Sequence, residues 1–254
     1  MTKDEKFEIS VLRDYRVVKS NDLIQKSRFE LSLQEQKIIL YLISKIKPND
    51  KEFEEYEFEI RKFCRLCGID YDNGKNYKNV KETIKKLSDK SLWVKLDTGK
   101  QVLLRWINEA SIDEKTGVIK LRLHNVMKPY LMELKSRFTQ YELVYTLGMK
   151  SRYAIRLYEL LKSYEHRGRW VVEIENLKKL LSAEIYERYV DFRRKVLEIA
   201  LREINELSDI YAAYEVIKSG RKYVKIEFEV RVKGSQEQTT AWLSRESALS
   251  QKCD

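Results

Sequence analysis

Two parts of the chain repeat the same order of expected elements, and this repetition constrains the fold more than any other feature. In the first part, apolar spacing and turn residues predict helix 33–46, strand 54–60, short helix 61–66, a long helix within 75–90, and hairpin strands 92–96 and 102–107. In the second part, they predict helix 154–164, strand 170–174, short helix 177–181, long helix 192–207, and hairpin strands 212–218 and 222–232.

The repetition extends to individual residues. Ile84, Leu87, Ser88 and Asp89 recur as Ile204, Leu207, Ser208 and Asp209, at a constant offset of 120 residues. These four residues stand at the same place in both copies, between a basic helix and a hairpin. We interpret the pattern as an internal duplication.

The order of elements in each copy is that of a winged helix, in which a β-hairpin wing flanks the recognition helix. We therefore expect an α+β fold with two winged-helix domains in tandem, related by internal duplication. A helix over 126–134, with Pro129 in its first turn, is expected to close the first domain. The expected divisions are an N-terminal tail 1–14, a first domain 15–137, a second domain 138–234 and a polar C-terminal tail 235–254.

The charge balance points to a polyanionic partner. The chain has 50 Lys and Arg residues against 40 Asp and Glu residues, a formal net charge of +10. Nucleic acid is the first candidate partner and an anionic membrane the second. Charges scattered over the surface would not indicate a polyanionic partner. The placement of the cations in the sequence therefore decides whether such a partner is expected.

The long helix of the first part carries lysines on the face opposite its apolar stripe. These are Lys75, Lys78, Lys85 and Lys86. Lysine is a flexible point charge, so we expect phosphate contacts here more than base contacts. The alternative is an ordinary solvated face. The hairpin after this helix, with Lys95 and Lys100, is expected to be a weakly binding wing.

The long helix of the second part is richer in arginine and is the better candidate for reading bases. Its expected DNA-binding residues are Arg188, Arg193, Arg194, Lys195, Glu198 and Arg202, with Arg221 and Lys222 on the wing. Arginine bonds guanine O6 and N7 together, and a glutamate accepts from a cytosine amino group. Arg193 is expected beside the apolar stripe. The alternative is a surface held by salt bridges, such as Arg194 with Glu198.

Catalytic and metal-binding signatures are weak, and we expect neither an enzyme nor a cofactor. Gly68 and Gly74 resemble a P-loop only superficially, because five residues separate them and Asn76 replaces the Ser or Thr. Cys64 and Cys67 lack the further ligands of a zinc site and are expected to pack in the core. The two histidines are too far apart for a metal-dependent nickase.

The location expected from the sequence is the bacterial cytoplasm. The longest apolar stretch, 38–43, is far shorter than the roughly 20 residues of a membrane helix. No secretory signal is visible at the N-terminus. The three cysteines form no disulfide framework, which fits a reducing compartment.

Several segments resemble one known family. The segments 17–24, 33–40, 63–69, 87–93, 192–197 and 203–205 are similar to signature blocks of the tandem winged-helix initiator Rep proteins of theta-replicating, iteron-type plasmids. The resemblance spans about residues 15–232, and its first block is the most specific.

The resemblance implies binding to repeated origin sites, called iterons. It places base reading on Arg193, Arg194 and Lys195, and backbone binding on Lys78 and Lys85. It further implies that monomers load the host replication initiator and helicase, and that dimers formed through the first domain repress the initiator's own promoter. An additional C-terminal domain of longer relatives is expected to be missing.

Three other functions remain open on the sequence. One is a winged-helix transcriptional regulator without a replication function. Another is an enzyme that acts on DNA. The third is a protein-interaction module whose positive charge is incidental.

Overall fold

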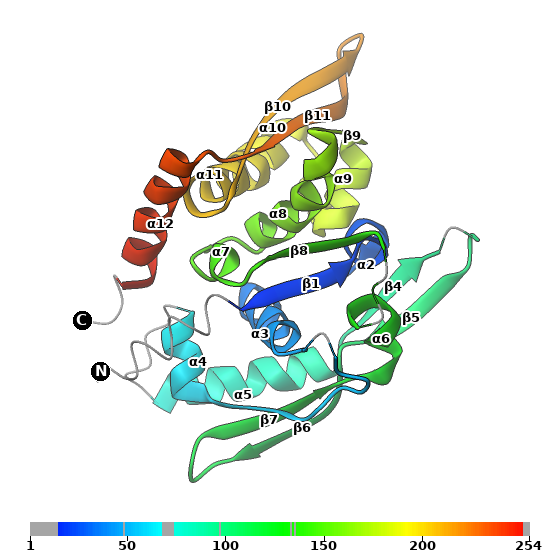
Figure 1. Ribbon diagram of the computed structural model, residues 1–254. Helices are drawn as coiled ribbons and strands as arrows, with labels where there is room; N and C mark the ends of the chain where they lie inside the picture. The colour runs from blue at the N-terminus through cyan, green and yellow to red at the C-terminus, as the bar shows by residue number, and fades with distance from the viewer. Residues whose placement is uncertain are drawn as a thin grey trace.

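The chain consists of two winged-helix halves that lie one above the other, with a two-stranded sheet between them (Figure 1). The computed structural model describes residues 15–47, 49–67, 74–96, 98–132, 134 and 136–250, and only the backbone of 74–77 and 250. The central sheet pairs β1 (Arg16–Ser20) with β8 (Phe138–Glu142) in antiparallel register.

The two halves repeat one topology. The first contains α3 (Leu33–Ser44), β3 (Tyr56–Glu59), α4 (Ile60–Leu66), α5 (Gly74–Ser88), β6 (Ile107–Asp113) and β7 (Val118–Leu123). The second contains α8 (Arg152–Tyr164), β9 (Arg169–Glu173), α9 (Ile174–Leu181), α10 (Tyr189–Phe192), a π-helical turn (Arg193–Leu197), α11 (Glu198–Leu207), β10 (Ile210–Ser219) and β11 (Lys222–Val232). Their sheets have the orders β6-β7-β3 and β10-β11-β9. The expected tandem winged-helix fold is confirmed.

Local sequence explains where α3 and α8, which occupy the same place in the two repeats, begin. The Ser32 hydroxyl accepts from the Glu35 amide, and the Glu35 carboxylate accepts from the Ser32 amide, which together form a capping box at α3. Ser151 caps α8 by accepting from the amide of Tyr153. Both caps satisfy amides that have no partner within the helix.

The first wing is not the hairpin that the sequence pattern suggested. Strands β4 (Ser91–Lys95) and β5 (Gln101–Arg105) pair with β2 (Ser27–Arg28) in a separate sheet, whereas β6 and β7 occupy the place of β10 and β11. Ile84 and Ile204 are 120 residues apart, but Ile107 and Ile210 are 103 apart. The β4–β5 hairpin is therefore an insertion of 17 residues into the first copy. Lys95 and Lys100 lie on this insertion and not on a wing.

Short elements and a longer C-terminal helix complete the described part of the chain. The short elements are α2 (Asn21–Lys26), a 3-10 turn (Asn125–Met127), α6 (Lys128–Leu131), α7 (Val144–Leu147) and a second 3-10 turn (Glu165–Arg167), and the longer helix is α12 (Ser235–Ser250). The expected helix over 126–134 is this 3-10 turn followed by α6, with Pro129 in the first turn of α6. The expectation of a polar tail from 235 is wrong, because α12 packs on α11 and buries Ala241, Arg245 and Leu249.

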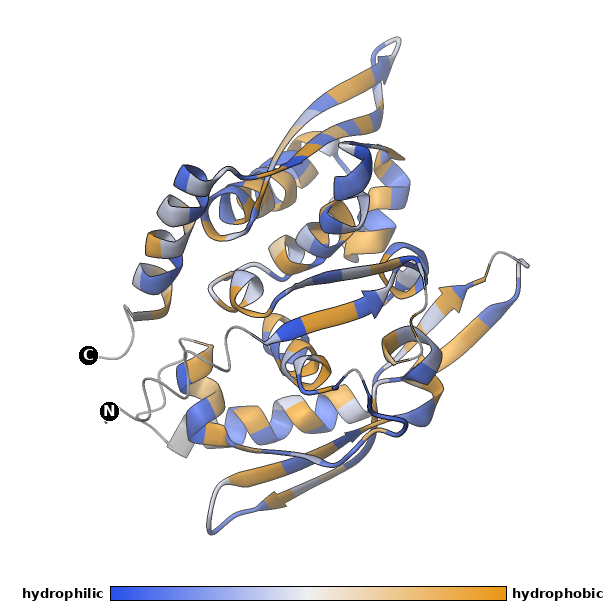
Figure 2. Cartoon of the chain, viewed as in Figure 1, coloured by the Kyte–Doolittle hydropathy of each residue, from blue (hydrophilic) through white to orange (hydrophobic). Residues whose placement is uncertain are grey.

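One continuous apolar core runs through both halves. It joins Trp106 and Phe63 of the first half to Phe192 and Phe228 of the second. Figure 2 shows the alternation of apolar and polar residues along β10 and β11, which turns one face of the hairpin's base toward this core. The two halves therefore share a hydrophobic interior.

Buried charges fix the junction between the halves. The ammonium of Lys19 on β1 lies 2.5 Å from the Glu159 carboxylate on α8, and the Tyr141 hydroxyl donates to the same oxygen at 2.6 Å. The guanidinium of Arg156 donates to the carbonyl oxygens of Ile24 at 2.6 Å and Ser27 at 3.1 Å. Burial lowers the pKa of Lys19. We keep the division at 137/138 as a proposed boundary, which the β1–β8 sheet bridges.

Candidate nucleic-acid interface

The second half presents a helix-turn-helix made of α9 and the continuous helix α10 to α11. The long helix buries Phe192, Val196, Leu197, Ala200, Leu201 and Ile204 against the core. The π-helical turn at 193–197 contains one residue more than an α-helical turn, so Phe192 and Leu197, five residues apart, both face inward. The opposite face of this helix, which we call the reading face, is left to Arg193, Arg194, Lys195 and Glu198.

The π-helical turn also decides which charges are paired. Glu198 lies 3.2 Å from the Nε atom of Arg193, and both side chains are about half exposed. The pair expected from α-helical spacing, Arg194 with Glu198, is thus replaced by a pair five residues apart. Among the described residues, no ion pair involves Arg194 or Lys195, and both are exposed. These two cations are available to an incoming anion.

Two further arginines of the predicted set lie at the edges of the reading face. Arg188 is 79 % exposed and stands just before α10, with its Nε atom 3.9 Å from Asp191. Arg202 is exposed on α11 and lines a shallow hollow between α11 and α12. The amide of Asn205, further along the helix, is used internally, because it donates to the Ala212 carbonyl and accepts from the Ala212 amide. Asn205 therefore positions the wing.

The second wing stands beside the beginning of the reading face. Lys218, Arg221 and Lys222 are exposed at its tip, where Gly220 turns the chain with a φ of 60°. The ring of Tyr223 stacks on Tyr189 of α10 at a centroid distance of 4.4 Å, and the Lys218 ammonium lies 4.9 Å from the Tyr223 ring. This stacking fixes the wing to the helix and makes their cations one basic surface.

In the first half, α5 presents part of the predicted lysine face. Lys78, Lys85 and Lys86 are exposed, and no ion pair of the described residues involves them. The side chain of Lys75 lies outside the described residues. Lys81 and Lys90, by contrast, pair with Glu114 at the tip of β6–β7 and with Glu35 on α3. Two of the lysines in this segment are therefore already paired within the protein.

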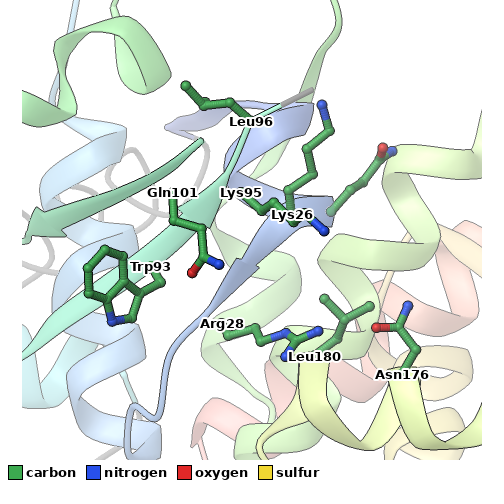
Figure 3. A pocket seen from close by; sticks show the side chains of 9 residues that line it. Lys26, Arg28, Trp93, Lys95, Leu96, Gln101, Asn176 and Leu180 are labelled. Carbon is green, nitrogen blue, oxygen red and sulfur yellow. The ribbon is translucent and has the colours of Figure 1, made fainter. Parts of the chain in front are cut away.

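A polar groove that the sequence did not suggest separates the inserted hairpin from the second half. It has a volume of about 580 Å³ and lies between β2, β4–β5 and α9. In Figure 3, Trp93 and Gln101 line one wall, Leu180 and Asn176 the other, and Arg28 points between them. Trp93 is 51 % exposed and faces Leu103 across the hairpin. The basic composition of residues 90–105 is the one sequence signal of this surface.

The residues considered for metal or nucleophilic chemistry have structural places. Cys64 and Cys67 are buried, and burial raises the pKa of the Cys64 thiol to about 11. His124 caps the 3-10 turn at 125–127, with its Nδ1 atom 3.3 Å from the Val126 amide. Within the described ranges, no three His, Cys, Asp or Glu side chains form a metal-binding group. The segment from Gly68 to Asn76, which resembles a P-loop only superficially, falls mostly outside these ranges.

Within the part of the chain that the structure describes, no helix is both long enough and apolar enough to cross a membrane.

Family models identify both halves of the chain. The model described as "Initiator Replication protein, WH1" matches residues 16–162, and the model described as "Initiator Rep protein, WH2" matches residues 173–230. The first match alone covers more than half of the chain. Together they contain both candidate DNA-contacting helices and the second wing.

Two individual proteins are also similar to the chain. The chain is 23 % identical over 221 residues to an uncharacterized 27.6 kDa protein of Escherichia coli, covering 81 % of this chain and 91 % of that protein. It is 28 % identical over 148 residues to the PI protein of Escherichia coli, a match that covers 50 % of this chain and 47 % of that protein.

A solved structure has the same fold. The crystal structure of Pi initiator protein in complex with iteron DNA matches 88 % of this chain and 99 % of its own, with a TM-score of 0.69 and 20 % sequence identity.

Proposed function

The chain belongs to the family of initiator replication proteins built from WH1 and WH2 domains, and from this premise we propose that it binds iterons at the origin of its plasmid. The observation that carries this proposal is the pair of exposed cations on the reading face, Arg194 and Lys195, beside a basic wing. The related Pi initiator protein was crystallised with iteron DNA, which supports the same class of ligand for this chain.

Each part of the surface has a proposed role. Arg194 and Lys195 bond base edges in the major groove, because arginine and lysine match the O6 and N7 acceptors of guanine. Arg193 and Glu198 engage bases as a pair, since each already holds the other in place. Arg188, Arg202, Arg221 and Lys222 contact phosphates around this groove.

The first domain contributes affinity more than specificity. Lys78, Lys85 and Lys86 project from α5 as separate point charges, which suit phosphate oxygens. Lys75 is assigned to the same role on its place in α5. The first domain is also proposed to form the homodimer, which represses the initiator's own promoter, while monomers recruit the host replication initiator and helicase. These steps take place in the bacterial cytoplasm and require no catalysis by this chain.

The test of DNA recognition is a competition assay with the full chain at about 150 mM salt, because low salt inflates phosphate contacts. Duplex DNA from the plasmid's own origin, including the region upstream of this gene, competes with scrambled duplex of equal length. We expect a preference for origin DNA above about a thousandfold. Equal affinity for both duplexes would overturn the proposal.

A replication assay separates an initiator from a transcriptional regulator. A plasmid carrying only the origin and a selectable marker is introduced into cells that supply this protein from a second plasmid. We expect colonies when the protein is supplied and none when it is absent. Specific binding to origin DNA without colonies would indicate that the protein is a transcriptional regulator and not an initiator.

A further inference from the structure

The segment 233–250 lies beyond both family matches, yet it binds the C-terminal end of α11. We call the continuous helix α10 to α11, which carries the reading face, the reading helix. Figure 1 shows α12 beside α11, and α12 also packs against α7. Ala241, Arg245 and Leu249 are its buried residues. The family match to the second domain ends at residue 230, before α12 begins.

Lys233 binds the C-terminal end of α11. Its side chain is almost fully buried, and its ammonium donates to the carbonyl oxygens of Asn205 at 2.6 Å and Ser208 at 2.7 Å. The backbone amide of Lys233 also donates to the Asp209 carbonyl at 2.9 Å. The last carbonyls of a helix have no partner within the helix and carry partial negative charge, so a cation stabilises them.

Arg245 binds the same helix end from α12. Its Nη1 atom donates to the Leu207 carbonyl at 3.2 Å, and its guanidinium lies 4.8 Å from the ring of Tyr145. Lys233 and Arg245 together therefore occupy the carbonyls of three residues at the end of α11. Both cations are buried in the protein and cannot reach DNA themselves.

The connection to α12 is itself fixed. Arg231 donates twice to the Glu237 carboxylate, at 2.8 and 2.7 Å, and Glu237 also accepts from the Gly234 amide at 3.0 Å. The bonds from Arg231 and Gly234 lower the pKa of Glu237 to about 2. Asn205, whose carbonyl binds Lys233, is bonded through its side chain to Ala212 on β10. The end of the reading helix, the wing and α12 thus meet at one place.

We propose that Lys233 and Arg245 are positioning residues for sequence reading, which hold α11 at the angle where Arg194 and Lys195 meet base edges. This inference rests on the proposed function. A bidentate base contact tolerates little displacement, whereas a phosphate contact adapts to a moved helix. Loss of either cation therefore lowers the preference for origin DNA and leaves non-specific affinity nearly unchanged.

The test compares Lys233→Met and Arg245→Met with the wild-type chain at about 150 mM salt. The dissociation constant is measured for origin duplex and for scrambled duplex of the same length. The preference is the dissociation constant for scrambled duplex divided by that for origin duplex. We expect this ratio to fall by about tenfold or more in each variant, because a displaced base contact costs about as much as one mismatched pair. The constant for scrambled duplex should change by less than about threefold.

Controls separate positioning from loss of charge or fold. Lys51→Met removes one exposed positive charge from the first half and should keep the ratio. Lys233→Arg keeps the charge and its donors and should recover most of the ratio. A ratio that stays at the wild-type value in both Met variants, or equal weakening on both duplexes, would overturn the inference. A wild-type chain without preference would instead overturn the proposed function.

Hydrogen exchange decides the matter should both Met variants fail to fold. In the wild-type chain, origin duplex should slow the exchange of backbone amides 205–211 more than scrambled duplex does, because specific reading requires the fixed helix end. Equal exchange with both duplexes would contradict the proposal.

Discussion

Arg194 and Lys195 are the residues with the most freedom to bind an anion on the reading face. Their neighbour Arg193 is held by Glu198 at 3.2 Å, so part of its charge is already neutralised within the protein. An exposed arginine without a carboxylate partner loses little on binding, because no internal pair must be broken. Base discrimination should therefore depend most on Arg194 and Lys195.

Arg194→Ala should raise the dissociation constant for origin duplex by about 10- to 100-fold, since one good bidentate base contact contributes about 1–3 kcal/mol of discrimination. The constant for scrambled duplex should change far less. Competition binding at about 150 mM salt measures both. Arg167→Ala removes an equal, exposed charge outside the reading face and serves as the control. Unchanged origin affinity in Arg194→Ala would remove this residue from the reading face.

Sequence periodicity located this cluster but not its internal pairing. A spacing of 3.6 residues per turn places Arg194 next to Glu198 on one helix face. The π-helical turn instead places Arg193 next to Glu198. One additional residue in a helical turn leaves no mark in composition or in the alternation of apolar residues. The shift becomes visible only through packing, because Leu197 is fully buried and Ile199 is partly exposed.

At the scale of elements, we propose different kinds of DNA contact for α5 and for the continuous helix α10 to α11. Replacing Lys78, Lys85 and Lys86 by Ala should weaken binding to all duplexes alike and reduce the slope of log K against log salt by up to about 0.9 per lost phosphate contact. Affinities measured between about 50 and 200 mM salt give this slope. Lys90→Ala is the matched control, because Lys90 already pairs with Glu35. A slope equal to that of the wild type would show that the α5 lysines do not touch DNA.

Sequence patterns did not show which hairpin is the first wing. Both β4–β5 and β6–β7 are antiparallel hairpins that contain apolar residues and a glycine in the turn, Gly99 and Gly117, each with positive φ. Pairing alone separates them: β7 joins β3, as β11 joins β9, whereas β4 joins the two-residue strand β2. A strand of two residues carries too little pattern to be predicted.

We predict that Lys233, in the segment that joins the wing to α12, makes the stability of the protein depend on pH. Burial lowers the pKa of Lys233 to about 8, whereas an unfolded lysine titrates near 10.4. Between these values the unfolded chain binds more protons, so the contribution of Lys233 to the free energy of unfolding rises with pH. Urea unfolding of the wild type and of Lys233→Met, from pH 7.5 to 9.5, measures the difference in slope. We expect the wild type to gain more stability than the variant over this window, and parallel curves would contradict the expectation.

At the scale of the whole molecule, the junction fixes the placement of α5 relative to α11, the two helices proposed to contact DNA. β1 pairs with β8, α8 packs against α2 and α3, and the buried Lys19–Glu159 pair joins β1 to α8. The duplication, read from the sequence, predicted two similar domains. It did not predict their contact, because Lys19 and Glu159 are 140 residues apart and polar residues ordinarily indicate surface. The junction therefore ties the two halves together through the β1–β8 sheet and the Lys19–Glu159 pair.

Lys19→Met tests this junction. The change leaves the Glu159 carboxylate buried without its closest cation, and removing one partner of a buried ion pair costs about 3–5 kcal/mol. Urea denaturation should show this loss in the free energy of unfolding. Lys26→Met is the matched control, because Lys26 forms a partly exposed pair with Asp22, which contributes at most about 1 kcal/mol. Equal losses in the two variants would mean that the junction depends on apolar packing and the β1–β8 sheet, and that the buried charges serve only to satisfy each other.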